Sequence, residues 1–136
     1  MLTKAKMTYY QTEMTRIRDA YYSNKRQIEM VVGTRHYINN NFDRELNLDF
    51  LSHMCFTSKF HFLRLFKKYY GVTPKQYLTD KRIEIAKELL RKGTNVTETC
   101  FATGFESPSS FSTLFKFRVG LAPAEFKKRA TFTKWN

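Results

Sequence analysis

The stretch SKFHFLRLFKKYYGVTPKQY, residues 58–77, returns later in the chain as SPSSFSTLFKFRVGLAPAEF, residues 107–126. At a constant offset of 49 residues, the same residue types recur in the same order. The matching pairs are Ser58 and Ser107, Phe62 and Phe111, Leu65 and Leu114, Phe66 and Phe115, Lys67 and Lys116, Gly71 and Gly120, and Pro74 and Pro123. A self-match this dense predicts that one structural unit is used twice.

The composition is that of a globular protein with a polyanionic partner. A chain of 136 residues can hold one domain or two very small ones. Aromatic residues make up 16% of it, which provides large side chains for a core and argues against disorder of the whole chain. Twenty-four Lys and Arg against 12 Asp and Glu give a net charge of +12, which favours a partner such as nucleic acid.

The positive charge follows the repeat. No acidic residue occurs from Phe50 to Thr79 or from Ser107 to Ala124. The basic residues of these two windows are Lys59, Arg64, Lys67, Lys68 and Lys75 in the first, and Lys116 and Arg118 in the second. This distribution is typical of a nucleic-acid-binding surface, and a solvated basic face without a partner is the alternative.

Helical spacing of apolar residues is common and strand alternation is scarce, so the sequence predicts an all-α fold. The expected helices span 5–24, 27–41, 48–55, 59–69, 75–91, 96–103, 109–118 and 123–130. Asn47, Ser58 and Thr73 are the expected N-caps of three of them, the last directly before Pro74 at a first helical position.

The helix that begins after Ser58 has two different faces. One contains residues at i, i+3, i+4 and i+7 and predicts a buried stripe, which is Phe62, Leu65, Phe66 and Tyr69. The opposite, outward face is Phe60, Leu63, Arg64 and Lys67. In the second copy the buried set is Phe111, Leu114 and Phe115, and the outward set is Ser109, Ser112, Thr113 and Lys116. The packing face repeats while the outward chemistry changes, so the two copies could recognise different parts of one ligand.

A short helix and a tight turn precede each of these helices, in LDFLSHMCFTS and VTETCFATGFES. A short helix, a tight turn and a second helix with a polar outward face together form the helix-turn-helix arrangement. The second helix of such a motif fits the DNA major groove, which is about 12 Å wide.

From about Gln27 to Arg129 the sequence resembles the DNA-binding domain of the AraC/XylS family of bacterial transcription regulators. The residues that carry the resemblance are Arg82, Ala86 and Leu89, the pair Gly104 and Phe105, the F-S-x-x-F-K motif of residues 111–116, and the G-x-x-P-x-x-F motif of residues 120–126. The resemblance implies two helix-turn-helix units joined by a long central helix.

That central helix, from about Lys75 to Arg91, would be about 26 Å long at 1.5 Å per residue. Successive major-groove segments on one face of DNA lie about 34 Å apart, so one chain could contact two of them. The expected division of the chain is 1–26 as an N-terminal helix or linker, 27–73 as the first unit, 74–92 as the connecting helix, 93–131 as the second unit and 132–136 as a tail.

By position, the resemblance assigns DNA contacts to both recognition helices. They are Lys59, Phe60, Leu63, Arg64 and Lys67 in the first and Ser109, Ser110, Ser112, Thr113 and Lys116 in the second, with further phosphate contacts from Ser58, Thr73 and Lys75. Arg64 is the best candidate for a bidentate contact to guanine. Thr113 stands where the family often has arginine, so the second unit is expected to bind more weakly.

The N-terminal segment carries a different pattern. Its apolar residues recur at alternating spacings of three and four with one polar member, as in a coiled coil. They are Met7, Tyr10, Met14, Ile17, Tyr21, Asn24, Ile28 and Val31. Residues 7–31 could therefore form a homodimer, or the helix could pack on its own domain.

Double-stranded DNA is the expected partner, and RNA polymerase would be a second one for an activator. The rival function is a protein-interaction module that uses the heptad helix and an exposed Phe60/Leu63 patch, and a third is a nucleic-acid coat without sequence preference. Either a partner or the protein's abundance sets its activity, or the chain is the output end of a longer regulator.

The sequence predicts no enzyme. It contains no zinc-ligand spacing, no phosphate-binding glycine loop and no supported acid pair, so no catalytic site, metal or cofactor is expected. Two cysteines are too few for a disulfide framework and suit a reducing compartment. No apolar run reaches the length of about 18 residues that a membrane helix needs. A cytoplasmic protein is therefore expected.

Overall fold

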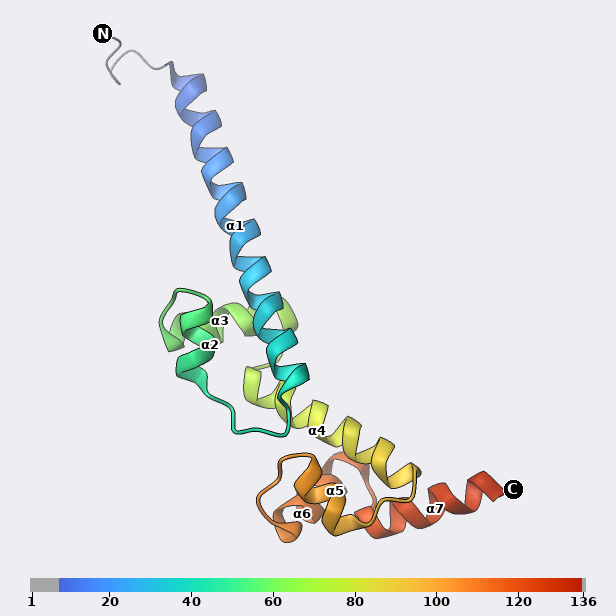
Figure 1. The fold of residues 1–136 in the computed structure, drawn as a ribbon. Helices are drawn as coiled ribbons and strands as arrows, with labels where there is room; N and C mark the ends of the chain where they lie inside the picture. Colours follow the sequence, from blue (N-terminus) through green and yellow to red (C-terminus); the bar gives the residue numbers. More distant parts are fainter. Residues whose placement is uncertain (1–7, 136) are drawn as a thin grey trace.

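A computed structural model describes residues 8–135, which form seven helices and no strand (Figure 1). The helices are α1 (Tyr9–Asn40), α2 (Leu48–Met54), α3 (Lys59–Tyr70), α4 (Pro74–Arg91), α5 (Val96–Ala102), α6 (Pro108–Val119) and α7 (Pro123–Trp135). The all-α prediction is confirmed. Most boundaries fall within a few residues of the expected ones, but α7 continues to Trp135 rather than ending at residue 130.

The predicted repeat is present in the structure. α2 and α5 have 7 residues each, and α3 and α6 have 12 each. Ser58 and Ser107 cap the N-termini of α3 and α6, and left-handed glycines, Gly71 and Gly120, end both helices. Identical caps at both ends fix the same helix length twice. We call α2 and α3 the first unit, and α5 and α6 the second unit.

α4 connects the two units and takes part in two hydrophobic cores. It has 18 residues, about 27 Å at 1.5 Å per residue. Its Leu78 packs in the first core, whereas Ile83, Ala86 and Leu90 pack in the second. The other buried members are Val31, Ile38, Leu51, Cys55, Phe62, Leu65 and Phe66 in the first core and Cys100, Phe111 and Phe115 in the second. A single straight helix therefore holds both units in a defined relation.

Arg82, near the middle of α4, ties the two cores together. Its guanidinium donates hydrogen bonds from Nε to the carbonyl of Phe42 (2.7 Å) and from Nη2 to the carbonyl of Arg44 (2.8 Å). The same group lies 5.6 Å from the ring centroid of Phe105 in the second unit. Burial lowers the pKa of the Arg82 guanidinium, and the nearby Asp43 carboxylate partly opposes this.

A direct backbone contact joins the loop after α1 to the turn of the second unit. A Cβ placed on Gly104 would lie 2.9 Å from the Cα, C and O atoms of Asp43. Only a glycine permits so close an approach, and Gly104 also has a left-handed φ of +90°. The contact leaves the two units little freedom to rotate relative to each other.

α1 differs from the prediction, because it is one continuous helix of 32 residues rather than two helices over 5–24 and 27–41. No glycine or proline occurs between residues 9 and 32, so nothing breaks the helix near residues 24–27, and Ser23 and Asn24 lie within it rather than capping it. Its buried residues are Val31, Thr34 and Ile38, all near its C-terminal end. The part of α1 before Arg26 projects away from the rest of the protein and most of its residues are exposed (Figure 1), so the alternative in which this segment packs on its own domain is wrong.

Candidate nucleic-acid interface

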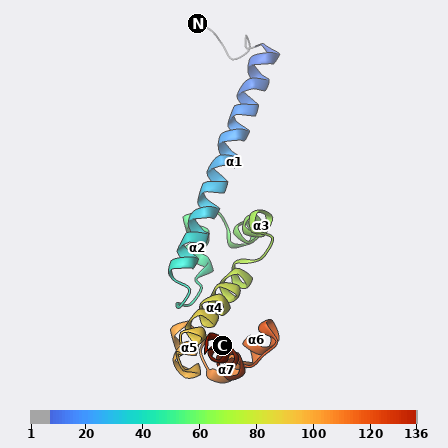
Figure 2. The same cartoon turned by 90° about the vertical axis from the view of Figure 1, so that its right-hand side faces the viewer.

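The two helices expected to contact DNA lie on the same side of the molecule. Figure 2 shows α3 and α6 on one side of α4, with α2 and α5 on the other. The first turns of α3 and α6 contain no acidic residue, and both last turns carry two basic residues. The two helices therefore lie on one side of α4, at different points along its length.

On α3, the outward side chains form a mixed apolar and basic surface. Phe60 is 78% exposed, and Arg64 and Lys67 are also exposed. Leu63 corrects the prediction, because it is half-buried and packs against the first core. The proposed Phe60/Leu63 patch is therefore reduced to a single exposed phenylalanine, which is a small surface for binding another protein.

The two basic side chains at the N-terminal end of α3 are in different states. The Nζ of Lys59 lies 2.9 Å from the Asp49 carboxylate of α2, so its charge is partly offset in the unbound protein. Arg64 has no ion pair or hydrogen bond among residues 8–135. Its guanidinium is available for a bidentate contact with a base.

On α6, the outward face is made of small polar side chains. Ser109, Ser110, Thr113 and Lys116 are exposed, whereas Ser112 is half-buried. The hydroxyl of Thr113 donates to the carbonyl of Ser109 at 3.0 Å, so in the unbound protein its donor is used within the helix. α6 presents short hydroxyl side chains where α3 presents the long, charged side chain of Arg64. This difference fits a weaker contribution of the second unit to DNA binding.

Phe117 is an outward residue that the sequence reasoning missed. It is 83% exposed on α6, one turn after Thr113 and next to Lys116. The sequence could have revealed it, because Phe117 is an aromatic residue outside the buried stripe of residues 111, 114 and 115.

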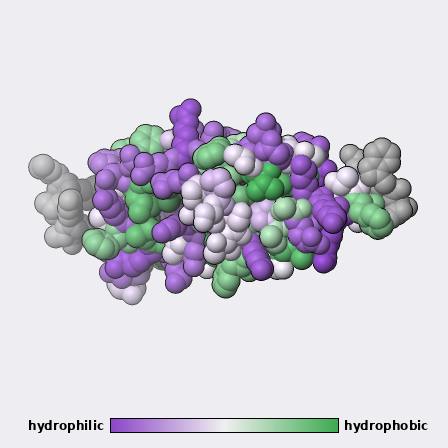
Figure 3. All heavy atoms as spheres, turned by 90° about the horizontal axis from the view of Figure 1, so that it is seen from below, coloured by the Kyte–Doolittle hydropathy of each residue, from purple (hydrophilic) through white to green (hydrophobic). Residues whose placement is uncertain are grey.

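Figure 3 shows the molecule from below, where hydrophobic residues form separate patches between hydrophilic ones rather than one continuous apolar face.

The predicted phosphate contacts are partly occupied by capping interactions. The Oγ of Ser58 accepts from the backbone N–H of His61 (3.2 Å). At the start of α4, the Thr73 N–H donates to the Gln76 side chain (2.9 Å), and the Gln76 N–H donates back to Thr73 Oγ1 (3.2 Å). Pro74 has no N–H, so the Lys75 backbone and side chain are the donors that remain for a phosphate at this helix end.

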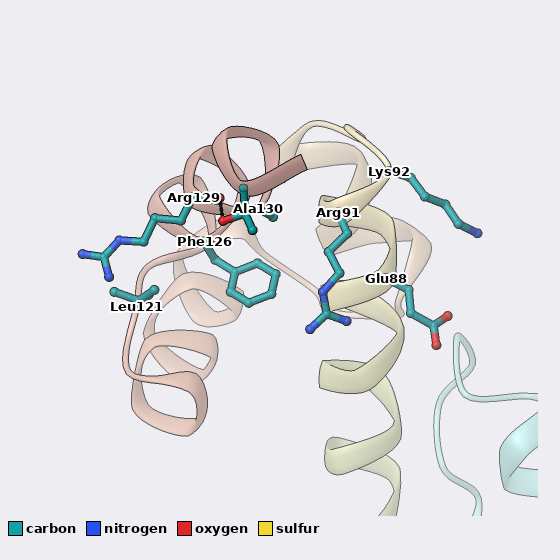
Figure 4. Close-up of a pocket in the computed structure, with 8 residues that line it drawn as sticks. Glu88, Arg91, Lys92, Leu121, Phe126, Arg129 and Ala130 are labelled. Carbon is teal, nitrogen blue, oxygen red and sulfur yellow. Dashed lines mark hydrogen bonds between the residues drawn. The ribbon is translucent and has the colours of Figure 1, made fainter. Parts of the chain in front are cut away.

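A hollow of about 720 Å³ between α4 and α7 is separate from this surface (Figure 4). Phe126 of α7 forms its floor, and the guanidinium of Arg91 lies 5.4 Å from the Phe126 ring centroid. None of its lining residues belongs to α3 or α6. It is therefore not part of the candidate DNA contact.

Residues 8–135 show neither a metal site nor a membrane-spanning helix. No group of three or more His, Cys, Asp or Glu side chains in that range is arranged to hold a metal ion. No helix in the described part of the chain is long and apolar enough to cross a membrane.

Comparison with known proteins gives a consistent family. The sequence matches the family described as "helix-turn-helix domain" over residues 51–129, more than half of the chain. It is 33% identical over 93 residues to the bifunctional transcriptional activator/DNA repair enzyme AdaA of Bacillus subtilis, covering 68% of this chain and 44% of AdaA. The chain spans 37% to 55% of the lengths of AdaA and two other matched regulators.

Solved structures share the fold. The C-terminal domain of AraT, a response regulator from Geobacillus stearothermophilus, superposes with a TM-score of 0.69 at 27% identity, covering 74% of this chain and 84% of that one. The DNA-binding domain of the global transcriptional factor AdpA, solved with a target DNA, gives a TM-score of 0.62 at 24% identity, covering 76% and 90%. With its duplicated helix-turn-helix and its arginine-anchored central helix, the chain belongs to the AraC/XylS family of DNA-binding transcription regulators.

Proposed function

We propose that the protein recognises double-stranded DNA sequence-specifically by placing α3 and α6 in two successive major-groove segments. The observation that carries the proposal is the position of both helices on one side of α4 (Figure 2). α4 is about 27 Å long, and groove segments on one face of DNA lie about 34 Å apart. Because one recognition helix lies towards each end of α4 on that side, the two helices can reach successive groove segments.

Within this arrangement Arg64 is the main base-contacting residue. A bidentate contact to guanine provides about 1–3 kcal/mol of discrimination. Phe60 would contact thymine methyl groups, and Ser109, Ser110 and Thr113 would contact bases in the second segment, with Ser112 half-buried at its edge. Ser58, Lys67, Thr73, Lys75 and Lys116 would hold phosphates, and these contacts position the protein without selecting a sequence. Lys59 can join them once DNA displaces its Asp49 partner.

The proposed role is activation of transcription, with RNA polymerase as a partner and a homodimer formed through residues 7–31. The similarity to AdaA, which is a bifunctional transcriptional activator and DNA repair enzyme, supports the first part. A reporter gene placed behind the selected DNA site tests the sign of regulation. When this protein is produced, expression of the reporter should rise, and a fall would mean that the protein is a repressor.

Selection of binding sites from randomised duplex DNA, followed by fluorescence anisotropy of the selected site, tests the proposal. We expect two conserved blocks about one helical turn apart. Arg64→Ala should weaken binding by about 1–3 kcal/mol and relax the sequence preference in one block. Arg129→Ala, which removes the same charge from exposed α7, is the matched control and should leave both blocks intact. Equal, salt-sensitive binding to every duplex would refute sequence recognition.

A further inference from the structure

The N-terminal two thirds of α1 has a hydrophobic stripe that is not covered by any other part of residues 8–135. Its members among the described residues, Tyr10, Met14, Ile17, Tyr21 and Ile28, are all exposed, Ile17 by 59%. Met7, the first residue of the predicted pattern, lies outside the described residues. Most helices in proteins are stabilised by packing of an apolar face, and this one packs against the first core only from Met30 onward, with Arg26 stacked on Phe56 just before it.

We infer that residues 10–28 of α1 form a parallel, in-register, two-stranded coiled coil with the same residues of a second copy of this chain. In a heptad, the d position follows the a position by three residues, and the next a follows d by four. Met14, Tyr21 and Ile28 are each followed by the next residue of the stripe three positions later, so they occupy the a positions. The d positions are Tyr10, Ile17 and Asn24, and the next member of the pattern, Val31, is buried in the first core, so the paired stretch ends before it. This inference deepens the proposed homodimer by fixing its orientation and register.

The surface of α1 already has the shape that this packing needs. A hollow of about 410 Å³ lies on the stripe, lined by Met14, Thr15, Ile17, Arg18, Tyr21 and Tyr22. In a parallel coiled coil, a side chain at d inserts into a hole formed by successive a, d, e and a residues of the facing helix. Those four positions are Met14, Ile17, Arg18 and Tyr21, so the hollow is the site for the second copy's Ile17.

Charge favours the parallel orientation. A g residue of one helix meets the e residue of the next heptad in a parallel partner. Glu13 is at g and Arg18 is at e, so each copy's Glu13 would meet the second copy's Arg18. In an antiparallel pair that overlaps the whole stripe, Arg18 would instead face the second copy's Arg18. Glu13 now lies 3.5 Å from Arg16 on its own helix, and that exposed pair is weak enough to rearrange.

Asn24 favours the same register. In a parallel, in-register pair it faces the second copy's Asn24, and the two side-chain amides can hydrogen-bond to each other. In the antiparallel pair described above it would face Met14, and its amide would be buried without a partner. A single polar layer of this kind selects one register among the alternatives.

A parallel pair places both DNA-binding regions at the same end of the coiled coil, because α1 continues directly into the first core. If the proposed DNA recognition is correct, one dimer therefore carries four recognition helices. Their combined binding would exceed that of a single chain wherever the DNA geometry lets both copies bind at once.

Sedimentation equilibrium of the full chain without DNA tests the pairing independently of DNA recognition. We expect a reversible monomer–dimer equilibrium in which Ile17→Lys raises the dissociation constant at least about tenfold. Ser23→Lys, at the exposed c position of the same helix, is the matched control and should change it little. A monomer at all concentrations, or equal effects of the two lysines, would overturn the inference.

Two further variants test orientation and separate a lost contact from a frayed helix. Tyr10→Cys should form a disulfide between copies under mild oxidation, because the native cysteines are buried and the parallel pair brings the two residues 10 together. Glu13→Arg alone should weaken the dimer, and the double variant Glu13→Arg, Arg18→Glu should restore it. A dimer that persists without cross-linking through residue 10, or an unrescued double variant, would rule out the parallel register.

Discussion

Replacing Gly104 with alanine should push the turn of the second unit away from Asp43, in the loop between α1 and α2. The left-handed backbone, with φ +90°, costs an alanine about 1–2 kcal/mol. The new Cβ would also lie 2.9 Å from three backbone atoms of Asp43, which cannot move as a flexible side chain would. Overpacking of this kind costs about 1–3 kcal/mol more. We therefore expect Gly104→Ala to lower the free energy of unfolding by about 2–5 kcal/mol in total.

Gly120→Ala is the matched control for this experiment. Gly120 has φ +91°, but no atom lies within 4 Å of its added Cβ, so alanine should cost only the backbone term of about 1–2 kcal/mol. Urea unfolding followed by far-UV circular dichroism gives both values, and their difference measures the contact with Asp43. Equal losses in the two variants would refute the reasoning.

The same pair of variants also tests how the units cooperate on DNA. If the Asp43 contact sets the relation between α3 and α6, Gly104→Ala should weaken binding to a two-block duplex more than binding to a duplex with the first block alone. Gly120→Ala has no contact with the first unit, so it should not alter the relation between the helices. Anisotropy titrations with the four protein and DNA combinations provide the comparison, and equal losses on both duplexes would mean that the contact does not orient the helices.

Two other outcomes concern stability. Gly33 is inside α1, and no atom lies within 4 Å of an added Cβ, so Gly33→Ala should raise the free energy of unfolding by about 0.5–1 kcal/mol in urea titrations. Burial raises the pKa of the Cys55 and Cys100 thiols, so the unfolded chain loses these protons first as pH rises. The free energy of unfolding should therefore fall above about pH 9, and less steeply in Cys55→Ala or Cys100→Ala, as pH-dependent denaturation would show.

The local features of the fold were predictable from the sequence, because each depends on neighbouring residues. Asn47, Ser58 and Thr73 accept hydrogen bonds at the helix starts where they were expected. The buried stripe of α3 is confirmed for Phe62, Leu65 and Phe66. Caps and helical periodicity act within one or two turns, so a single sequence is enough to reveal them.

What depends on distant residues was not predictable. The Arg82 hydrogen bonds join positions 38 and 40 residues apart, and nothing local signals them. Leu63 has the correct spacing for the outward face but is half-buried, because Phe60 and Leu63 lie on slightly different sides of α3 and the first core reaches Leu63. The ion pair of Lys59 with Asp49 likewise depends on how α2 crosses α3.

The turns of the two units show why the repeat is not perfect. The first turn places Phe56 at a left-handed φ of 51°, whereas the second uses Gly104 and contains one more residue before the capping serine. Phe56 is 78% exposed with Arg26 stacked 5.5 Å from its ring centroid, so its side chain has space and the backbone strain is tolerated. At Gly104 the backbone of Asp43 lies so close that there is no space for a side chain. Both turns place a left-handed residue two positions after the end of the short helix, and only in the second does the contact with Asp43 constrain that residue.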